Sequence, residues 1–208
     1  MNIAILSSGR TEGRNFHKNI LKGFDIIICA DGGANNAELL GIKPNYIIGD
    51  MDSIKPEVME KFEKESVKII RDNNQGMTDT ELAIRLALSL KPKKIILLGC
   101  IGNRFDHTIA NTLSLDKIPD EIDAVIADDK NEIRLLKGGA LNISGTKNDI
   151  ISVMPLTEVK GLSYEGLKWA VNDRDFGFGW FGVSNRMTGN NAKISVDKGK
   201  ILVIKSRD

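Results

Sequence analysis

Short apolar runs alternate with longer segments of helical period over roughly the first 116 residues. The runs have the length and composition of buried strands, and the segments between them place apolar residues at helical spacing. This alternation is typical of βα units on a mostly parallel sheet. The predicted strands are residues 3–6, 25–30, 46–48, 67–70 and 94–98, and the predicted helices are residues 57–64, 81–90 and about 106–115.

The pattern changes after Pro119, where short apolar runs are separated only by turn signals such as Gly138-Gly139 and Lys198-Gly199. Strands are predicted at residues 124–127, 132–136, 150–154 and 201–204, and no helix is required. The fold class is therefore α/β: an N-terminal mostly parallel βα sheet domain, residues 1–120, followed by a small all-β sandwich domain, residues 121–208.

Composition agrees with a soluble, cytoplasmic protein. The chain has 208 residues, with 29 basic and 28 acidic side chains, so net charge gives no reason to expect nucleic acid or a membrane surface as a partner. Two cysteines are too few for a disulfide framework and suggest a reducing compartment. The longest apolar runs are much shorter than the ~18 residues that a membrane span needs.

Two familiar nucleotide motifs are excluded. The G-x-G-x-x-G string at residues 177–182 follows a polar stretch and opens no helix. Gly161 and Gly166 have the spacing of a P-loop, but Leu167 stands where the lysine must be. A nucleotide would have to be held in another way.

Asp50 and Asp52 directly follow the predicted strand at residues 46–48. Residues two apart in extended chain point to the same side, and two carboxylates ~5 Å apart repel by about 3 kcal/mol at an effective dielectric of 20. A divalent cation would reverse this repulsion, and oxygen ligands of this type favour Mg²⁺. The alternative is a turn in which Asp52 or Ser53 caps the helix that Pro56 helps to start.

Polar clusters also follow two other strands. Asp31 precedes the pair Gly32 and Gly33, which would let a phosphate or base approach backbone N–H groups, or would simply form a tight strand-to-helix turn. After residues 94–98, Arg104 is suited to phosphate, and Asp106 is placed as a helix N-cap.

Thr78 and Glu81 match the capping box of a helix, so Asp79 between them would then serve as a favourable charge in the first helical turn. Together with the other clusters, it would meet at one rim of a parallel sheet. Acids, glycines and an arginine at one rim imply a phosphorylated, anionic ligand with a metal ion. The sequence contains no G-x-S-x-G string, the motif that would indicate a serine hydrolase instead.

In this order and spacing the clusters resemble the thiamine pyrophosphokinase family. The matching stretches are residues 30–35, 44–54, 75–79 and 98–107, with residues 166–169 and 183–185 in the last third. The resemblance implies Mg²⁺-dependent transfer of a diphosphoryl group from ATP to the hydroxyl of thiamine, giving thiamine diphosphate and AMP. It also implies a homodimer with an active site shared between subunits.

The resemblance also implies roles for individual residues. The metal ligands would be Asp50, Asp52 and Asp79, which with Arg104 would carry catalysis. The ATP contacts would be Asp31, Gly32, Gly33, Asn35, Arg104, Asp106 and His107. The thiamine contacts would be Gln75, Thr78, Ser184 and Asn185. Trp180 would stack on the thiamine cation or pack within the β-domain.

Gly76 departs from the family pattern, which usually has an acid just after the Gln75 position. Two other functions therefore stay open: a sensor that binds thiamine or a nucleotide without turnover, and a metal-dependent nucleotide phosphohydrolase.

Overall fold

The computed structural model describes residues 1–74 and 76–207. The chain forms two compact units, Met1–Asp129 and Lys130–Asp208. The first unit extends beyond residue 120 because the strand β6 (Asp123–Ala127) pairs in parallel with β5 (Lys94–Leu98).

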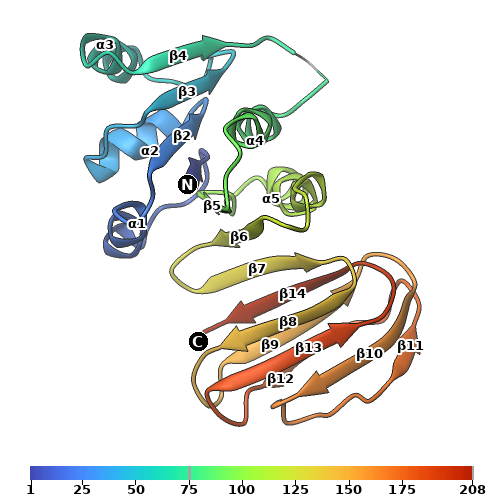
Figure 1. Cartoon of the computed structure of the whole chain (residues 1–208). Helices are drawn as coiled ribbons and strands as arrows, with labels where there is room; N and C mark the ends of the chain where they lie inside the picture. The colour runs from blue at the N-terminus through green and yellow to red at the C-terminus, as the bar shows by residue number, and fades with distance from the viewer. Residues whose placement is uncertain (75, 208) are drawn as a thin grey trace. The chain divides into compact units, whose positions relative to one another are not determined.

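A parallel sheet forms the centre of the first unit, with strand order β6-β5-β1-β2-β3-β4 (Figure 1). The remaining strands are β1 (Asn2–Leu6), β2 (Ile26–Ala30), β3 (Tyr46–Gly49) and β4 (Lys68–Arg71). The chain builds β1 to β4 outward in one direction and then places β5 on the other side of β1. The order of the sheet thus reverses between β1 and β5.

Helices cover both faces of this sheet, with α1, α2 and α3 on one side and α4 and α5 on the other (Figure 1). They are α1 (Arg14–Leu21), α2 (Gly33–Leu40), α3 (Pro56–Lys64), α4 (Asp79–Ser89) and α5 (Phe105–Leu113), followed by the 3₁₀ helix η1 (Ser114–Lys117). Ile3, Ala4, Ile5 and Leu6 of β1 are all fully buried. Burial on both faces explains why the strands read as continuous apolar runs rather than as alternating ones.

The helix starts confirm one predicted cap and correct two others. Thr78 and Glu81 form the reciprocal capping box of α4. Helix α3 has Pro56 at its start but Lys55 at the N-cap, so neither Asp52 nor Ser53 caps it. Asp106 lies inside the first turn of α5, and Arg104 occupies the N-cap without a side-chain cap, because the Asp106 carboxylate instead accepts hydrogen bonds from Arg104.

The second unit is an antiparallel sandwich, as the sequence predicts. Its strands are β7 (Asn131–Leu136), β8 (Gly139–Ser144), β9 (Ile150–Pro155), β10 (Val159–Glu165), β11 (Arg174–Phe176), β12 (Gly182–Arg186), β13 (Asn191–Val196) and β14 (Ile201–Ser206). Within this unit β12-β9-β14-β7 and β11-β10-β13-β8 are neighbours in order. Ile151 and Val203 from the first set pack with Leu162 and Ile194 from the second in one apolar core.

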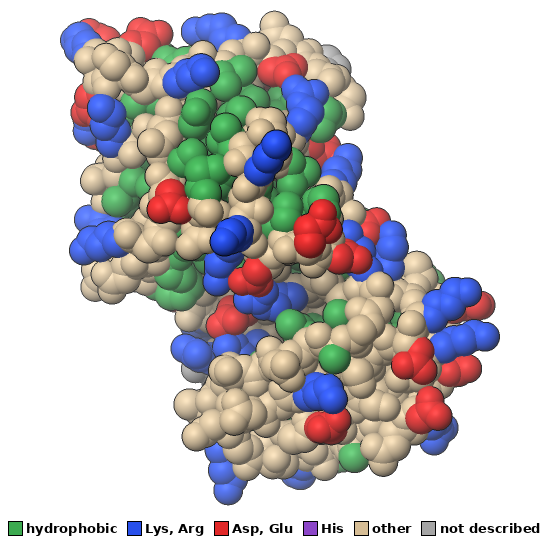
Figure 2. All heavy atoms as spheres, in the orientation of Figure 1, with side chains coloured by type: hydrophobic (Ala, Val, Ile, Leu, Met, Phe, Trp, Pro, Cys, Tyr) green, Lys and Arg blue, Asp and Glu red, His purple; other side chains and the backbone are tan. Residues whose placement is uncertain are grey.

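The surface carries both signs of charge. Figure 2 shows Lys and Arg side chains interspersed with Asp and Glu over the face drawn. Among the described residues, no helix combines the length and the apolar character needed to span a bilayer.

Candidate active site

A cavity of about 440 Å³ opens in the first unit where β1, β2 and β5 end. Five stretches of chain contribute to its walls, one after each of the strands β1 to β5. The described lining residues are Ser7, Ser8, Gly9, Arg10, Ala30, Asp31, Ser53, Thr78, Asp79, Thr80, Gly99, Cys100, Gly102, Asn103, Arg104, His107, Thr108 and Asn111. The convergence that the sequence predicts at the carboxyl ends of the strands is therefore present.

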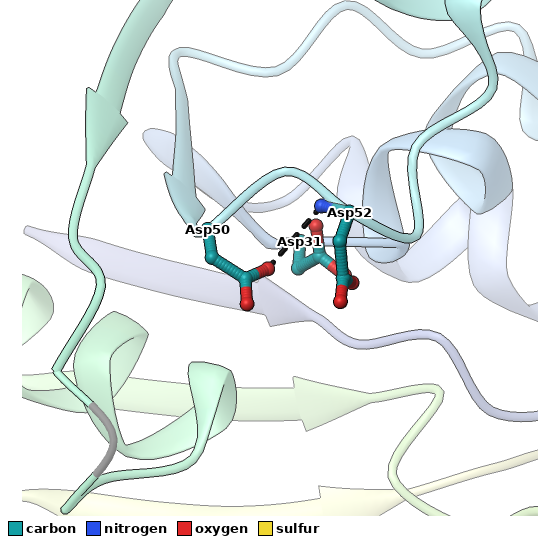
Figure 3. Close-up of side chains that lie close together, drawn as sticks. All are labelled: Asp31, Asp50 and Asp52. Atoms are coloured by element: carbon teal, nitrogen blue, oxygen red, sulfur yellow. Dashed lines mark hydrogen bonds between the residues drawn. The ribbon is translucent and has the colours of Figure 1, made fainter.

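Asp31, Asp50 and Asp52 turn their carboxylates toward one another (Figure 3). One carboxylate oxygen from each lies within 4.8 Å of the others. Asp31 is 4% exposed, and its Oδ1 is buried without a hydrogen-bond partner among the described residues. A buried carboxylate oxygen without a partner is energetically costly. A hard divalent cation would coordinate this oxygen, and the cluster supplies the carboxylate ligands that such a cation prefers.

Asp79 approaches the same cluster from the first turn of α4. Burial, followed by repulsion from Asp31, Asp50 and Asp52, raises the pKa of Asp79 to about 6, against a partly opposing backbone hydrogen bond. A raised carboxyl pKa is expected where several carboxylates lie close together in a partly buried site.

The backbone bends sharply where two of these acids lie. Asp31 at the end of β2 has φ 39° and Met51, between Asp50 and Asp52, has φ 73°. Left-handed geometry costs roughly 1–2 kcal/mol for a residue with a Cβ, although Asp tolerates it better than most. Strained residues of this kind cluster at functional sites, where the surrounding structure holds them in place.

Arg104 and His107 line the cavity from the loop after β5 and the start of α5. The Arg104 guanidinium makes two hydrogen bonds to Asp106, Nε to Oδ1 at 3.0 Å and Nη2 to Oδ2 at 2.6 Å. This pairing holds the pKa of Asp106 well below its usual range. Asp106 therefore binds Arg104 and is not among the described residues that line the cavity.

Gly33 and Asn35 stabilise the local structure around the start of α2. A Cβ on Gly33 would lie 1.9 Å from the Leu6 carbonyl oxygen, so glycine is required where α2 packs against the end of β1. The Asn35 amide donates to the Ser53 carbonyl at 2.8 Å and accepts from the Lys55 N–H at 3.0 Å. Together with Gly32 they lie beside the described cavity lining rather than in it.

Ser7, Ser8, Gly9 and Arg10 line the cavity although the sequence analysis did not select them. Ser7 Oγ lies 3.0 Å from Thr80 Oγ1, linking the end of β1 to α4. These residues could have been found by the same signal as the other site residues, a polar cluster directly after a predicted strand, because they follow the predicted strand at residues 3–6.

In the second unit, Asn185 is 6% exposed and its side-chain amide makes three hydrogen bonds. Its Oδ1 accepts from the N–H groups of Trp169 at 3.1 Å and Arg186 at 2.9 Å, and its Nδ2 donates to the Trp169 carbonyl at 2.8 Å. The adjacent Ser184 is exposed with φ 60°. Asn185 thus shapes this end of β12, whereas the Ser184 side chain faces solvent.

Trp180 stacks on Phe176, with ring centroids 3.8 Å apart and 20° between the planes. It also packs against the core of the second unit, which is the packing alternative of the sequence analysis. Gln75 lies outside the described residues.

Comparisons with known proteins agree with this arrangement over both units. A family model described as thiamin pyrophosphokinase, catalytic domain, matches residues 17–126, and one described as thiamin pyrophosphokinase, vitamin B1 binding domain, matches residues 133–201. Thiamine pyrophosphokinase from Bacillus subtilis is 29% identical over 173 residues, covering 81% of each chain.

Thiamine pyrophosphokinase 1 from Arabidopsis thaliana is 28% identical over 202 residues, covering 85% of this chain and 75% of its own. The crystal structure of the Bacillus subtilis thiamine pyrophosphokinase superimposes with a TM-score of 0.88 at 26% identity, covering 100% of both chains. With both domain models matched in order, the chain belongs to the thiamin pyrophosphokinase family.

Proposed function

We propose that this protein transfers a diphosphoryl group from ATP to the hydroxyl of thiamine, giving thiamine diphosphate and AMP with Mg²⁺ as the metal. The observation that carries this function is the acid cluster formed by Asp31, Asp50 and Asp52, in which Asp31 lines the cavity together with the neighbouring Asp79. Membership of the family supports the same reaction.

The donor set fits Mg²⁺, which usually takes one or two carboxylates together with substrate phosphates. We assign Asp50 and Asp52 to the ion, as the sequence suggested, and add Asp31 on the strength of its buried, unpartnered oxygen. When bound, the ion would neutralise negative charge on the phosphate oxygens.

Asp79 was expected among the metal ligands, and its position beside the other acids supports a second task. In the metal-free protein, burial and these neighbouring acids raise the pKa of Asp79 to about 6, so its carboxylate takes up a proton more readily than an isolated one. In the proposed step the thiamine hydroxyl oxygen attacks the β-phosphorus, and the bond to the bridging oxygen of the α-phosphate breaks. The hydroxyl proton passes to the Asp79 carboxylate, and AMP leaves.

ATP would occupy the cavity of the first unit, which we assign as the ATP- and metal-binding catalytic domain. Arg104, oriented by Asp106, and His107 would contact the nucleotide, and Gly32, Gly33 and Asn35 would hold the adjoining turn in shape. Placing a positive group such as the Arg104 guanidinium where phosphate charge develops is a main catalytic resource of phosphoryl transfer.

We assign the second unit to thiamine, with Ser184 as a contact and Asn185 as the group that shapes the surrounding backbone. Gln75 and Thr78 complete the proposed thiamine set. We further propose a cytoplasmic homodimer that shares its active site between subunits, in keeping with the exposed apolar side chains Trp169, Phe181 and Val183.

One assay tests the function against its alternatives. The purified protein is incubated with thiamine, ATP and Mg²⁺, and AMP and thiamine diphosphate are measured together. Equal amounts of the two products support the kinase. Phosphate release that does not depend on thiamine would identify a phosphohydrolase, and tight thiamine binding without product would identify a sensor.

A further inference from the structure

The segment Ser7–Arg10, called here the β1 loop, lies at the point where the strand order of the first unit reverses. β1 pairs with β2 on one side and with β5 on the other. In open parallel sheets, ligands bind in the crevice beyond the carboxyl ends of the strands at such a point. All four residues of the β1 loop line the cavity there.

Hydrogen bonds fix the β1 loop from two directions. The N–H of Gly9 donates to the Gly99 carbonyl at 2.7 Å, and the N–H of Arg10 donates to the Ile101 carbonyl at 2.8 Å. From α2, the Asn36 side-chain Nδ2 donates to the carbonyls of Ser7 and Gly9, each at 2.9 Å. The Arg10 backbone is therefore preorganised at the cavity edge.

Close packing allows little freedom in this arrangement. A Cβ on Gly9 would lie 2.4 Å from the Gly99 carbonyl oxygen, so the β1 loop and the loop after β5 touch through their backbones. The two loops that carry Arg10 and Arg104 are thus direct neighbours.

Charge is divided along this rim of the sheet. The acids stand at the ends of β2 and β3 and at the start of α4, whereas the arginines stand after β1 and β5. Arg104 is already paired with Asp106. Within the described part of the chain, Arg10 forms no ion pair with a carboxylate, so its guanidinium donors remain available to a ligand.

We propose that Arg10 binds phosphate oxygens of the nucleotide and that Asn36 is the positioning residue that holds it there. This assignment rests on the proposed function for the presence of ATP. Strands in a sheet are about 5 Å apart, so the β1 loop lies roughly 10 Å from the end of β3, a span that a polyphosphate chain bridges. An arginine suits this task because its planar donors match two phosphate oxygens at once.

Equilibrium binding of Mg²⁺–ATP without thiamine, measured by titration calorimetry, tests the proposal on the full chain. Arg10→Ala should weaken ATP binding about tenfold, the scale of one lost charged hydrogen-bond pair, and Arg10→Lys should weaken it less. Arg14→Ala is the matched control, because Arg14 is exposed four residues later and outside the described cavity lining. It should leave the affinity unchanged.

An Arg10→Ala protein that binds ATP within twofold of wild type would overturn the assignment. The two proposals fail differently: a wild-type protein that binds ATP but forms no thiamine diphosphate rejects the proposed function and leaves the Arg10 comparison intact. A wild-type protein that does not bind ATP rejects both.

Asn36 is tested by a double-mutant cycle. Asn36→Ala should also weaken ATP binding, and adding it to Arg10→Ala should cause little further loss, because its effect is exerted through Arg10. Losses that simply multiply would show that Asn36 acts independently of Arg10 and would remove its positioning role.

Discussion

Gly49 lies directly against Asp79: a Cβ placed on Gly49 would come within 2.7 Å of the Asp79 Oδ1 and within 2.9 Å of the Asp31 Cβ. The last residue of β3 thus sets the space in which the acids meet. Its φ of 146° also favours glycine.

Gly49→Ala should therefore reduce turnover by at least about tenfold, because the new methyl group displaces the Asp79 carboxylate. The backbone term should destabilise the fold by about 1 kcal/mol as well. Gly41→Ala is the matched control, since Gly41 has φ 65° but nothing within 4 Å of its Cβ position. Equal activity in the two variants, measured alongside thermal unfolding, would contradict the crowding argument.

Asp52→Asn should abolish most turnover, by about 100-fold or more, while the fold remains intact. Asp52 is exposed and its task is metal charge rather than packing. Mg²⁺ titration by calorimetry should show weaker binding, and Glu63→Gln, an exposed change on α3, should behave as wild type. A normal rate in Asp52→Asn would remove this residue from the metal site.

Asp79 should titrate near pH 6 in the metal-free protein, and Asp31→Asn should move that midpoint down. Its pKa is raised on folding, so the ionised form opposes folding, and its cost is absent below the unfolded value near pH 4 and grows as pH rises through about 6. Carboxyl NMR titration measures the midpoint directly. A midpoint near 4 in both proteins would remove the electrostatic basis for the proton-acceptor assignment.

Asn185→Ala should destabilise the protein by about 2 kcal/mol, because the N–H groups of Trp169 and Arg186 lose a buried acceptor. Urea denaturation measures this loss. Asn172→Ala, at an exposed position, should change stability little. A stable Asn185→Ala protein with poor thiamine binding would assign the amide to the ligand instead.

Ser184→Ala should raise the thiamine KM more than the ATP KM, since Ser184 lies in the unit assigned to thiamine. Steady-state kinetics with each substrate varied in turn gives both values. A change confined to ATP would reverse the assignment of substrates to the two units.

The parallel sheet and its acidic rim could be predicted because both follow from local sequence. Four of the five predicted strands are followed by a polar cluster that the sequence singled out, and parallel strands bring their carboxyl ends to one edge. The convergence of Asp31, Asp50 and Asp79 could therefore be predicted without knowledge of long-range contacts.

The capping box of α4 could be predicted, but the N-cap of α5 could not, because the Asp106 carboxylate accepts hydrogen bonds from the Arg104 guanidinium, a stronger partner than a helix N–H. For a related reason, the sequence could not show that the guanidinium N–H groups of Arg10 are available to a ligand. Only the folded chain shows that Arg104 is paired with Asp106, whereas Arg10 forms no ion pair with any residue that the structure describes. In the sandwich, β8, β10, β11, β12 and β13 were not singled out from the sequence. Polar residues and glycines interrupt the alternation in β8, β10 and β12, and β11 has only three residues, whereas β13 alternates regularly and its pattern would have identified it.

The four acids come from three stretches of chain, at the ends of β2 and β3 and at the start of α4. A cation bound among them acts as a removable crosslink between these segments, in addition to the sheet and to the hydrogen bonds that Asn35 makes between the segments after β2 and β3. By mass action it adds stability in proportion to the logarithm of its concentration above its dissociation constant. Chelation should consequently loosen the first turn of α4 before the rest of the unit, with faster amide hydrogen exchange and earlier proteolytic cleavage there.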